Sequence, residues 1–422
     1  MYFKKAEQEL IKTDKLKSFS VIGDPGCEGV GIVMMQTYAS ALTAAEDDDM
    51  ILIAGDMVPA GNRHFYETAK NLTEAVAKKD VYTLKGNHDT GDYEKYCGLA
   101  DYMIRGKDFS IAVLDNASRR FSDKGLELLG RELEEQEVKQ VVIAFHIPVP
   151  NHFTGNAVSD EEFARLRKVY RPYKDKVSYL LCGHVHSRFE DEVDGIPFIC
   201  TGGGGAFIED VSEDIRACDV DHHIVRFFLK EGKLTHSVVD LESIPYTCEV
   251  QDKVLREEIE GALAGELMAH FKYLTYADRA RRRGYEKTAN LFEALAESEY
   301  RHARSFYNLI EKHTAFTSEA DKYTAREKFE AENLYPMLSE YASGQGKILC
   351  SQAFSDAGEA EKVHARLLSE VSENMEGYPH DTIYVCPVCG YVMAGEQAPE
   401  RCPVCGAPSK SFKKFSEAED RD

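Results

Sequence analysis

The C-terminal part of the chain carries two Cys-x-x-Cys pairs, Cys386-Pro-Val-Cys389-Gly and Cys402-Pro-Val-Cys405-Gly. Two such pairs supply four thiolates, the number that one tetrahedral metal site needs. The glycine after each pair permits a tight turn that aims backbone N–H groups at sulfur. The segment around them is too short to build much hydrophobic core, so we expect a metal to hold it together. Tetrahedral sulfur suits both zinc and iron.

Read with their neighbours, as Cys-Pro-x-Cys-Gly-Tyr and Cys-Pro-x-Cys-Gly-Ala, these pairs resemble rubredoxin, a family of electron carriers with one iron bound by four cysteines. The resemblance covers about Tyr384 to Phe415. It implies an iron–thiolate centre held by the four cysteines, in a small domain that we place at residues 379–422.

Residues 252–374 show almost no strand signal. Ala, Glu, Leu, Lys and Arg dominate there with a 3.6-residue period, which predicts helices. Breaks near Gly284, Thr314–Asp321 and Gly344–Gly346 divide the stretch into four helices, the count of a four-helix bundle. We expect this all-α, ferritin-like domain to span residues 247–378.

Carboxylates and histidines recur in the helical region at metal-binding spacing. Two Glu-x-x-His motifs each place both members on one helix face, and the other two helices each add glutamate. This is the donor set of di-iron carboxylate bundles. A single Glu-x-x-His is commonly a charged surface pair, but an acidic motif on every helix favours a di-iron site. In chain order the donors are Glu266, Glu299, His302, Glu327, Glu330, Glu361 and His364.

The bundle resembles rubrerythrin, and the C-terminal position of the rubredoxin-like segment matches that family. The resemblance runs from about Val254 to Phe415. It implies that the seven donors hold two irons, with Tyr273 and Tyr335 donating hydrogen bonds to the ligating carboxylates. It also implies that Glu330 lets one iron exchange glutamate for histidine as its redox state changes.

Residues 1–246 alternate short apolar runs with helical stretches, the pattern of an α/β fold whose sheets are buried on both faces. Polar residues follow one run after another, so oxygen and nitrogen ligands should converge at the carboxyl ends of strands. Such donors suit two borderline metals that activate a water. The residues are Asp24, Asp56, Asn87, His88, Asp89, His146, His184 and His186.

This set resembles the calcineurin-like metallophosphoesterases over about Phe19 to Leu241. That family folds as two packed mixed sheets flanked by helices and uses two divalent metals, here Mn, Fe or Zn. The resemblance gives the first metal Asp24, Asp56 and His186, and the second metal Asp56, Asn87, His146 and His184. His88 would stabilise the transition state or protonate the leaving oxygen, with Asp89 orienting it.

The first motif departs from the family pattern. Asp-x-His is usual there, whereas this chain reads Asp24-Pro25-Gly26, and Gly26 cannot bind a metal. The first metal therefore loses a ligand unless water, Cys27 or Glu28 substitutes. We expect weak binding at the first site, and we expect Gly26→His to tighten it if the turn accepts a side chain.

The amino-acid composition limits the partners that this protein can bind. A net charge of −22 disfavours nucleic acid and anionic membranes, because like charges repel. No apolar run reaches the length of about 18 residues that a membrane span needs. The N-terminus, Met1-Tyr-Phe-Lys, lacks the apolar stretch of a signal peptide. We therefore expect a cytoplasmic, reducing location, where cysteines serve as metal ligands or free thiols.

Together the parts predict a peroxidase that reduces hydrogen peroxide to water, fused to a metal-dependent phosphoesterase-like domain and acting in oxidative-stress defence. An NAD(P)H-dependent rubredoxin reductase or a similar donor would supply electrons, because no dinucleotide-binding fingerprint occurs. We expect a homodimer or larger homo-oligomer, and the phosphoester substrate is not identified. Two alternatives stay open: a phosphohydrolase gated by an iron-based oxidant sensor, and an iron storage or sensing protein with a degenerate phosphoesterase domain.

Overall fold

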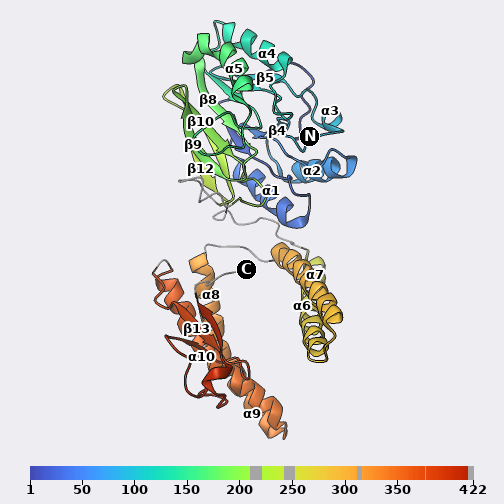
Figure 1. Ribbon diagram of the computed structural model, residues 1–422, viewed down its shortest axis with the longest axis vertical. Helices are drawn as coiled ribbons and strands as arrows, with labels where there is room; N and C mark the ends of the chain where they lie inside the picture. Colours follow the sequence, from blue (N-terminus) through green and yellow to red (C-terminus); the bar gives the residue numbers. More distant parts are fainter. Residues whose placement is uncertain (210–220, 242–251, 311–315, 376, 417–422) are drawn as a thin grey trace. The chain divides into compact units, whose positions relative to one another are not determined.

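The computed structural model describes residues 1–209, 221–241, 252–310, 316–375 and 377–416 (Figure 1). The chain divides into two compact units, Met1–Lys312 and His313–Asp422. The expected domain boundary at 246/247 lies outside the described residues, and the expected boundary at 378/379 stays a prediction. Among the described residues, no helix is both long and apolar enough to cross a bilayer.

The larger of two sheets in the N-terminal part has seven strands in the order β1-β5-β6-β7-β8-β10-β9. It is mixed, because β7 runs parallel to β6 and β8 whereas β10 runs antiparallel to β9. Its strands are β1 (Leu10–Lys12), β5 (Tyr102–Arg105), β6 (Ser110–Val113), β7 (Val141–Ala144), β8 (Val177–Cys182), β9 (Arg188–Val193) and β10 (Ile196–Thr201).

The smaller sheet has five strands in the order β12-β11-β2-β3-β4. Its three strands from the start of the chain are parallel, so their carboxyl ends lie at one edge. The hairpin expected at the end of this part supplies the other two strands. The strands are β2 (Ser18–Ile22), β3 (Met50–Ile53), β4 (Asp80–Thr83), β11 (His223–Lys230) and β12 (Lys233–Asp240).

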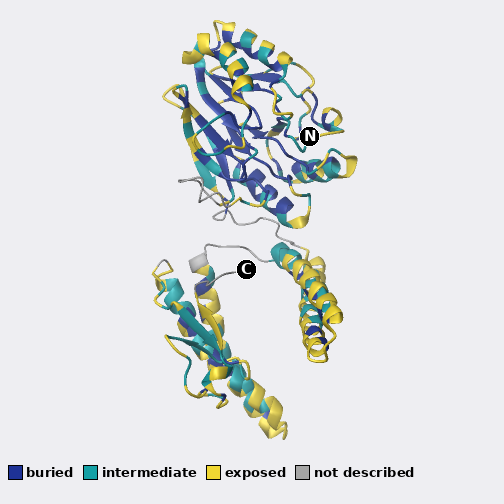
Figure 2. Cartoon of the chain, viewed as in Figure 1, coloured by how far each residue is buried: buried dark blue, intermediate teal, exposed yellow. Residues whose placement is uncertain are grey.

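The two sheets pack face to face over one apolar core, in which Phe19 and Phe227 of the smaller sheet meet Tyr179 of the larger one. Helices pack on the outer faces of the sheets. The buried residues, dark blue in Figure 2, fill the interior of this part. This is the predicted sandwich of two mixed sheets flanked by helices. The helices are α1 (Ile32–Ala44), α2 (Arg63–Val76), α3 (Tyr93–Tyr96), α4 (Asp123–Glu134), α5 (Asp160–Tyr170) and the 3₁₀ turn η1 (Arg171–Lys176).

One hairpin of the larger sheet was not among the expected elements. Strands β9 and β10 are joined by Asp194-Gly195, and both residues have positive φ, +56° and +73°. Aspartate followed by glycine is a strong signal for a two-residue hairpin turn of this kind. Strand β9 begins two residues after His186, so the hairpin anchors the segment that carries the last predicted metal ligands.

Two long helices follow, α6 (Lys253–Arg281) and α7 (Glu286–Ile310), and pack as a hairpin. The Asp252 side chain caps α6 by accepting a hydrogen bond from the Leu255 N–H at 2.7 Å. The expected break at Gly284 is confirmed, since this glycine takes a φ of +77° between the helices.

In the second compact unit, α8 (Phe316–Phe329), η2 (Glu330–Leu334) and α9 (Tyr335–Gly344) follow directly upon one another, and α10 (Ile348–Glu373) packs along them. The helix already begins at Phe316, so the break expected over Thr314–Asp321 is too long. Segment η2 is a π-helical turn, an element that the 3.6-residue period could not reveal.

The cysteine-rich segment forms a three-stranded sheet in the order β14-β13-β15. Its core contains little beyond cysteines and Ala407, with Tyr391, Val404 and Phe412 packed against them. The elements are β13 (Thr382–Val385), β14 (Val392–Ala394), the 3₁₀ turn η3 (Ser409–Ser411) and β15 (Lys413–Ser416).

Candidate metal centres

The strand ends of the N-terminal part bring the predicted donors together. Asp56 follows β3, while His146 and His184 follow β7 and β8 of the other sheet. One donor atom from each of these three lies within 4.8 Å of the others. The site is therefore built from both sheets, at the carboxyl ends of parallel strands.

Three of these donors hold the backbone in the left-handed region. Asp24, Asp56 and His184 have φ of +53°, +49° and +75°. This conformation is uncommon for residues other than glycine and concentrates at functional sites. It turns the chain sharply just after β2, β3 and β8.

The ring of His146 shows which nitrogen faces the donors. Its Nδ1 donates to the carbonyl oxygen of Ala54 at 2.9 Å. Its Nε2 lies 3.0 Å from Asn87 Oδ1 and 3.2 Å from Asp56 Oδ2. Burial also lowers the pKa of His184 to about 3, so that ring is neutral and keeps a lone pair for a metal.

Asp24 provides the test of whether a cation fits. Its Oδ2 accepts from the backbone N–H of His184 at 2.9 Å, but the fully buried Oδ1 has no hydrogen-bond partner among the described residues. Burial raises the pKa of this carboxyl to about 7. Oδ1 lies 3.8 Å from His186 Nε2. A buried acceptor without a donor is costly, and a divalent cation would satisfy it.

The structure gives His88 and Asp89 partners other than those expected. The His88 ring places Nδ1 at 3.1 Å from the Pro59 carbonyl oxygen. The fully buried Asp89 carboxylate accepts from the backbone N–H groups of Gly86 at 2.9 Å and Val58 at 3.3 Å. Asp89 therefore fixes the loop that carries Asn87 and His88, rather than the His88 ring itself.

The structure excludes the expected benefit of Gly26→His. The Gly26 N–H donates to the Asp56 carbonyl oxygen at 3.1 Å, which holds the loop close against the end of β3. A Cβ on Gly26 would stand 2.1 Å from the Met57 carbonyl oxygen. No side chain can occupy this position without moving the backbone, so glycine is required there.

On the α6–α7 hairpin, three of the predicted di-iron donors meet. His302 Nδ1 lies 3.0 Å from Glu299 Oε2 and 3.9 Å from Glu266 Oε2. A hydrogen bond from Glu299 and burial raise the pKa of Glu266, which marks two carboxyl groups sharing one space. Tyr273, expected beside these carboxylates, stacks on the ring of Phe292.

A matching triad lies on α8 and α10. His364 Nδ1 lies 2.6 Å from Glu361 Oε2 and 3.7 Å from Glu327 Oε2. Glu327 Oε2 is buried without a hydrogen-bond partner among the described residues, and burial with Glu361 raises the pKa of Glu327 to about 7. The triad thus combines two carboxyl groups with one imidazole, an excess of negative charge that a bound cation would balance. The structure brings each triad together within its own unit.

Glu330 and Tyr335 bracket the π-helical turn beside the second triad. Glu330 opens the turn and accepts from Arg326 Nε at 3.0 Å. Burial and the carboxylates of Glu330, Glu361 and Glu327 raise the pKa of Tyr335, whose ring stacks on that of Phe354. A π turn shifts the helical register by one residue, and such turns are frequent at functional sites.

The four cysteines meet as predicted. Cys386 Sγ lies 3.6 Å from Cys405 Sγ, and Cys389 Sγ lies 3.6 Å from Cys402 Sγ. Metal–sulfur bonds of about 2.3 Å in a tetrahedron give sulfur–sulfur edges of about 3.8 Å, so the cluster fits one metal. Burial raises the pKa of Cys402, but hydrogen bonds from the backbone N–H groups of Cys405 and Val404 outweigh it and lower this pKa to about 7.

The glycines after the pairs behave as the sequence predicts. Gly390 and Gly406 have φ of +80° and +75°, and each donates its N–H to the carbonyl of the first cysteine of its pair at 2.9 Å. These two turns have the same construction and face each other across the cluster.

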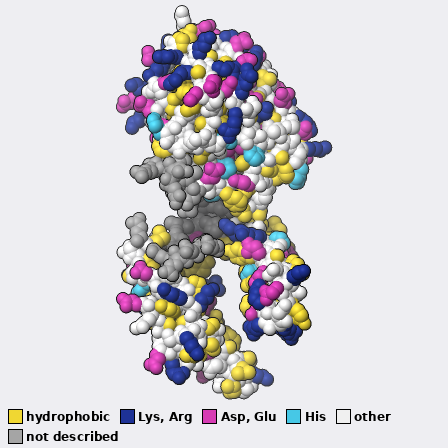
Figure 3. Space-filling view, viewed as in Figure 1, with side chains coloured by type: hydrophobic (Ala, Val, Ile, Leu, Met, Phe, Trp, Pro, Cys, Tyr) yellow, Lys and Arg dark blue, Asp and Glu magenta, His cyan; other side chains and the backbone are white. Residues whose placement is uncertain are grey.

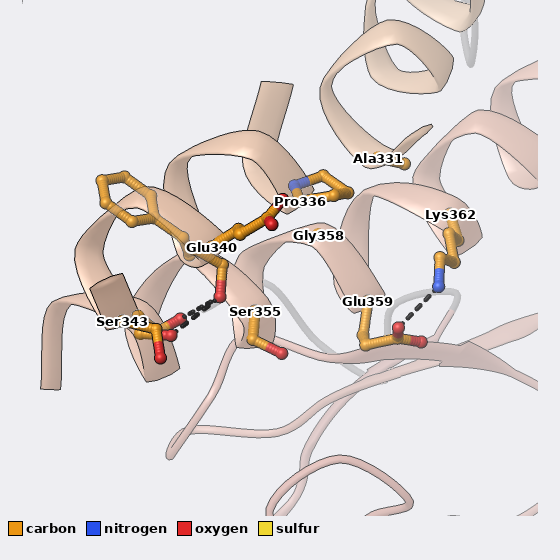
Figure 4. Close-up of a pocket in the computed structure, with 11 residues that line it drawn as sticks. Ala331, Pro336, Glu340, Ser343, Ser355, Gly358, Glu359 and Lys362 are labelled. Carbon is orange, nitrogen blue, oxygen red and sulfur yellow. Dashed lines mark hydrogen bonds and ion pairs between the residues drawn. The ribbon is translucent and has the colours of Figure 1, made fainter. Parts of the chain in front are cut away.

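A pocket of about 460 Å³ lies along η2, α9 and α10 (Figure 4). Glu359 and Lys362 at its rim form an ion pair. Neither member of the α8–α10 triad on α10 lines this pocket. The pocket is therefore separate from the predicted ligands.

Comparison with known families agrees with this division. The model of the calcineurin-like phosphoesterase family matches residues 18–188, the rubrerythrin model matches 257–329, and the model of the rubrerythrin rubredoxin-like domain matches 384–413. Nigerythrin of Nitratidesulfovibrio vulgaris is 32% identical over 173 residues, covering 38% of this chain and 85% of nigerythrin.

The chain belongs to the rubrerythrin family.

Other proteins are similar to parts of this chain. Rubrerythrin of Clostridium perfringens is 30% identical over 183 residues, covering 38% of this chain and 94% of that protein. Among solved structures, nigerythrin in a mixed-valence state aligns with a TM-score of 0.24 at 32% identity, covering 38% of this chain and 86% of that one. A purple acid phosphatase from yellow lupin, Lupinus luteus, aligns with a TM-score of 0.45 at 15% identity, covering 55% of this chain and 52% of that one.

This rubrerythrin-family chain therefore joins three metal-binding parts: a dimetal phosphoesterase domain, a di-iron rubrerythrin domain and a four-cysteine rubredoxin-like domain. It is a di-iron protein of the oxidative-stress type fused to a phosphoesterase domain.

The close approach at Gly26 generates a test of the loop. Gly26→Ala should destabilise the α/β part by about 1–3 kcal/mol or more, because the new Cβ collides with the Met57 carbonyl. Gly29→Ala in the same loop is the matched control, since its Cβ would make only ordinary contacts, with Met34 Sδ at 3.7 Å and the Gly31 nitrogen at 3.8 Å. Denaturant unfolding of both full-length variants, with hydrogen exchange of β2 and β3 as the local readout, makes the comparison. Equal stability of the two variants would contradict the prediction.

Proposed function

We propose that the rubrerythrin-like part is a peroxidase that reduces hydrogen peroxide to water, in oxidative-stress defence in the cytoplasm. The observation that carries this proposal is the repeat of one donor triad, Glu with Glu-x-x-His, on two helical hairpins of a chain that also holds a four-cysteine cluster. When bound, two ferrous ions supply the two electrons that convert one peroxide and two protons into two waters.

The seven donors that would hold these irons are Glu266, Glu299, His302, Glu327, Glu330, Glu361 and His364. The carboxylates provide the anionic charge that two divalent ions require, and each histidine is held by the glutamate one turn before it. Tyr335, which directly follows the π-helical turn that Glu330 opens, would donate its hydroxyl proton to a neighbouring carboxylate. Glu330 would leave Arg326 to reach a metal, which suits a ligand that changes partner.

The four-cysteine centre would return electrons one at a time. Because the sequence shows no dinucleotide fingerprint, an NAD(P)H-dependent rubredoxin reductase or a similar protein is the proposed donor. The half-exposed Cys389 and the exposed Cys405 give such a donor access to the cluster.

For the N-terminal part we propose metal-dependent phosphoester hydrolysis. When bound by Asp24, Asp56, Asn87, His146, His184 and His186, two divalent metals (Mn, Fe or Zn) would supply the positive charge that activates a water. His88 is only half-buried at the site and would protonate the leaving oxygen. Asp89 acts as a positioning residue through the loop backbone.

Electron delivery through the cysteines is tested by Cys402→Ser. We expect loss of the iron–thiolate absorption and of peroxide turnover driven by a rubredoxin reductase, because one of four ligands is gone. The chemically reduced di-iron site should still react once with peroxide. The measurement is visible spectroscopy with stopped-flow peroxide mixing. Undiminished reductase-driven turnover would contradict the electron-transfer role.

Assembly is tested by mixing variants. We propose a homo-oligomer in which the cysteine centre of one copy serves the irons of another. Helix α6 offers a contact surface, with Leu267, Phe271 and Leu274 at 47%, 67% and 43% exposure. Hydrophobic side chains are visible on the surface of the helical parts in Figure 3. Hybrids of Cys402→Ser with Glu299→Ala should recover turnover that neither parent shows. Hybrids of Cys402→Ser with Cys389→Ser, which lack the centre in both copies, should not. Verified hybrids without recovery would show that transfer runs within one chain.

Hydrolysis is tested by Asp56→Asn. Asp56 belongs to two donor groups, one with His146 and His184 and one with Cys27 and His88. Its loss should therefore lower aryl phosphodiester hydrolysis by about 100-fold or more, beyond the usual cost of a supporting group. Added Mn²⁺ should raise the activity of the unchanged chain and not that of the variant. Lys85→Met, at an ion pair with Asp115, serves as a control for general damage. Hydrolysis that survives Asp56→Asn would show that it arises elsewhere.

A further inference from the structure

The residue that replaces the missing ligand of the first metal can be identified from the loop after β2. Two backbone hydrogen bonds shape this loop, from Gly26 N–H to the Asp56 carbonyl and from Gly29 N–H to the Gly26 carbonyl, both at 3.1 Å. The second bond closes a turn with Cys27 and Glu28 at its centre. Both side chains are therefore fixed near the site by the same turn.

Glu28 already has a structural role in this turn. Its Oε1 lies 3.1 Å from His186 Nδ1, and its Oε2 accepts from the Phe207 N–H at 3.2 Å. A carboxylate on Nδ1 orients the ring and leaves Nε2 as the metal-binding nitrogen, the arrangement common around metal-bound histidine. Nε2 of His186 is indeed the atom that faces Asp24 Oδ1.

Cys27 lies among the donors themselves. Its Sγ is within 4.8 Å of donor atoms of Glu28 and His186, and also within 4.8 Å of donor atoms of Asp56 and His88. Cys27 is 8% exposed, so its side chain is largely shielded from solvent.

A second, independent feature marks a cation in the same space. Asp24 Oδ1 is fully buried and lacks a hydrogen-bond partner among the described residues. It faces His186 Nε2 at 3.8 Å and His146 Nε2 at 4.0 Å. An acceptor of this kind requires a positive partner, which places the cation beside Asp24 and His186, and Cys27 is grouped with the same histidine.

We propose that the Cys27 thiolate is a ligand of the first metal, in the place that histidine takes in the family pattern. This inference rests on the proposed dimetal site. Binding exchanges the thiol proton for the metal: the S–H bond breaks, a sulfur–metal bond forms and one proton leaves to solvent. No oxidation takes place.

The ligand type determines which metal the site prefers. Thiolate is a soft donor that favours Zn²⁺ and Fe²⁺, whereas Mn²⁺ and Mg²⁺ favour oxygen. A histidine at this position would discriminate less strongly. Cys27 therefore biases the first site toward Zn²⁺ or Fe²⁺, and the second site, with oxygen and nitrogen donors alone, does not share this bias.

Cobalt provides a readout that does not depend on activity. The probe is Co²⁺ added anaerobically to the metal-free full chain in which the four C-terminal cysteines are serine, so that their cluster adds no thiolate absorption. We expect a near-ultraviolet thiolate-to-cobalt band in this chain and its loss on Cys27→Ser. Cys97→Ser, a buried cysteine of the core around α2 and α3, should keep the band.

Affinities give the second measurement. Cys27→Ser should weaken Zn²⁺ binding at one site by about tenfold or more and change Mn²⁺ binding less. A band that survives Cys27→Ser, or equal losses for Zn²⁺ and Mn²⁺, would overturn the inference. If no variant binds metal in the N-terminal part, the proposed dimetal site fails instead, so the two failures are distinguishable.

Alkylation of the unchanged chain covers the case in which Cys27→Ser does not fold. Mass spectrometry should show that Zn²⁺ slows iodoacetamide modification of Cys27 and leaves the exposed Cys350 unaffected. Unaltered Cys27 modification at saturating Zn²⁺ would refute ligation.

Discussion

Asp24, Asp56 and Asp89 place three carboxyl groups in an interior that excludes water, and the loops of the α/β part are arranged around them. A buried carboxylate is tolerated only when donors or cations surround it. Backbone N–H groups satisfy both oxygens of Asp89, and the His184 N–H satisfies one oxygen of Asp24. The remaining oxygen of Asp24 has no donor. The hydrogen bonds thus set the shape of the site and leave a need for positive charge at one defined point.

The helical part also contains a buried carboxylate oxygen that needs a positive partner, although its carboxylates are less buried than those of the sandwich. Glu327 leaves one buried oxygen without a donor, whereas Glu299 is partly accessible to water. The C-terminal domain differs from both, because its sulfurs face one another and the apolar core around them is very small. A bound ion there contributes to folding itself, while in the sandwich the fold is held by an apolar core that exists without it.

Much of this could be predicted from the sequence because the informative patterns are local. The Cys-x-x-Cys-Gly pairs specify their own turns, and Glu-x-x-His specifies one helix face, so Glu299 with His302 and Glu361 with His364 meet as expected. Features that depend on backbone approach could not be read in this way. The sequence left open whether the turn at Gly26 accepts a side chain, because the Met57 carbonyl that blocks it follows a different strand. The partners of Asp89 and the π turn at Glu330 likewise follow from packing between segments.

The left-handed conformations of Asp24, Asp56 and His184 have a consequence for the cell. Each conformation costs on the order of 1–3 kcal/mol, and the surrounding structure must offset that cost. A cation that binds only the folded form stabilises it by an amount that grows with the logarithm of its free concentration. The lifetime of the α/β part against proteolysis would then follow the supply of the metal. In a metal-starved cell the α/β part would lose this added stabilisation and keep that of its apolar core, whereas the C-terminal domain would lose the ion on which its folding depends.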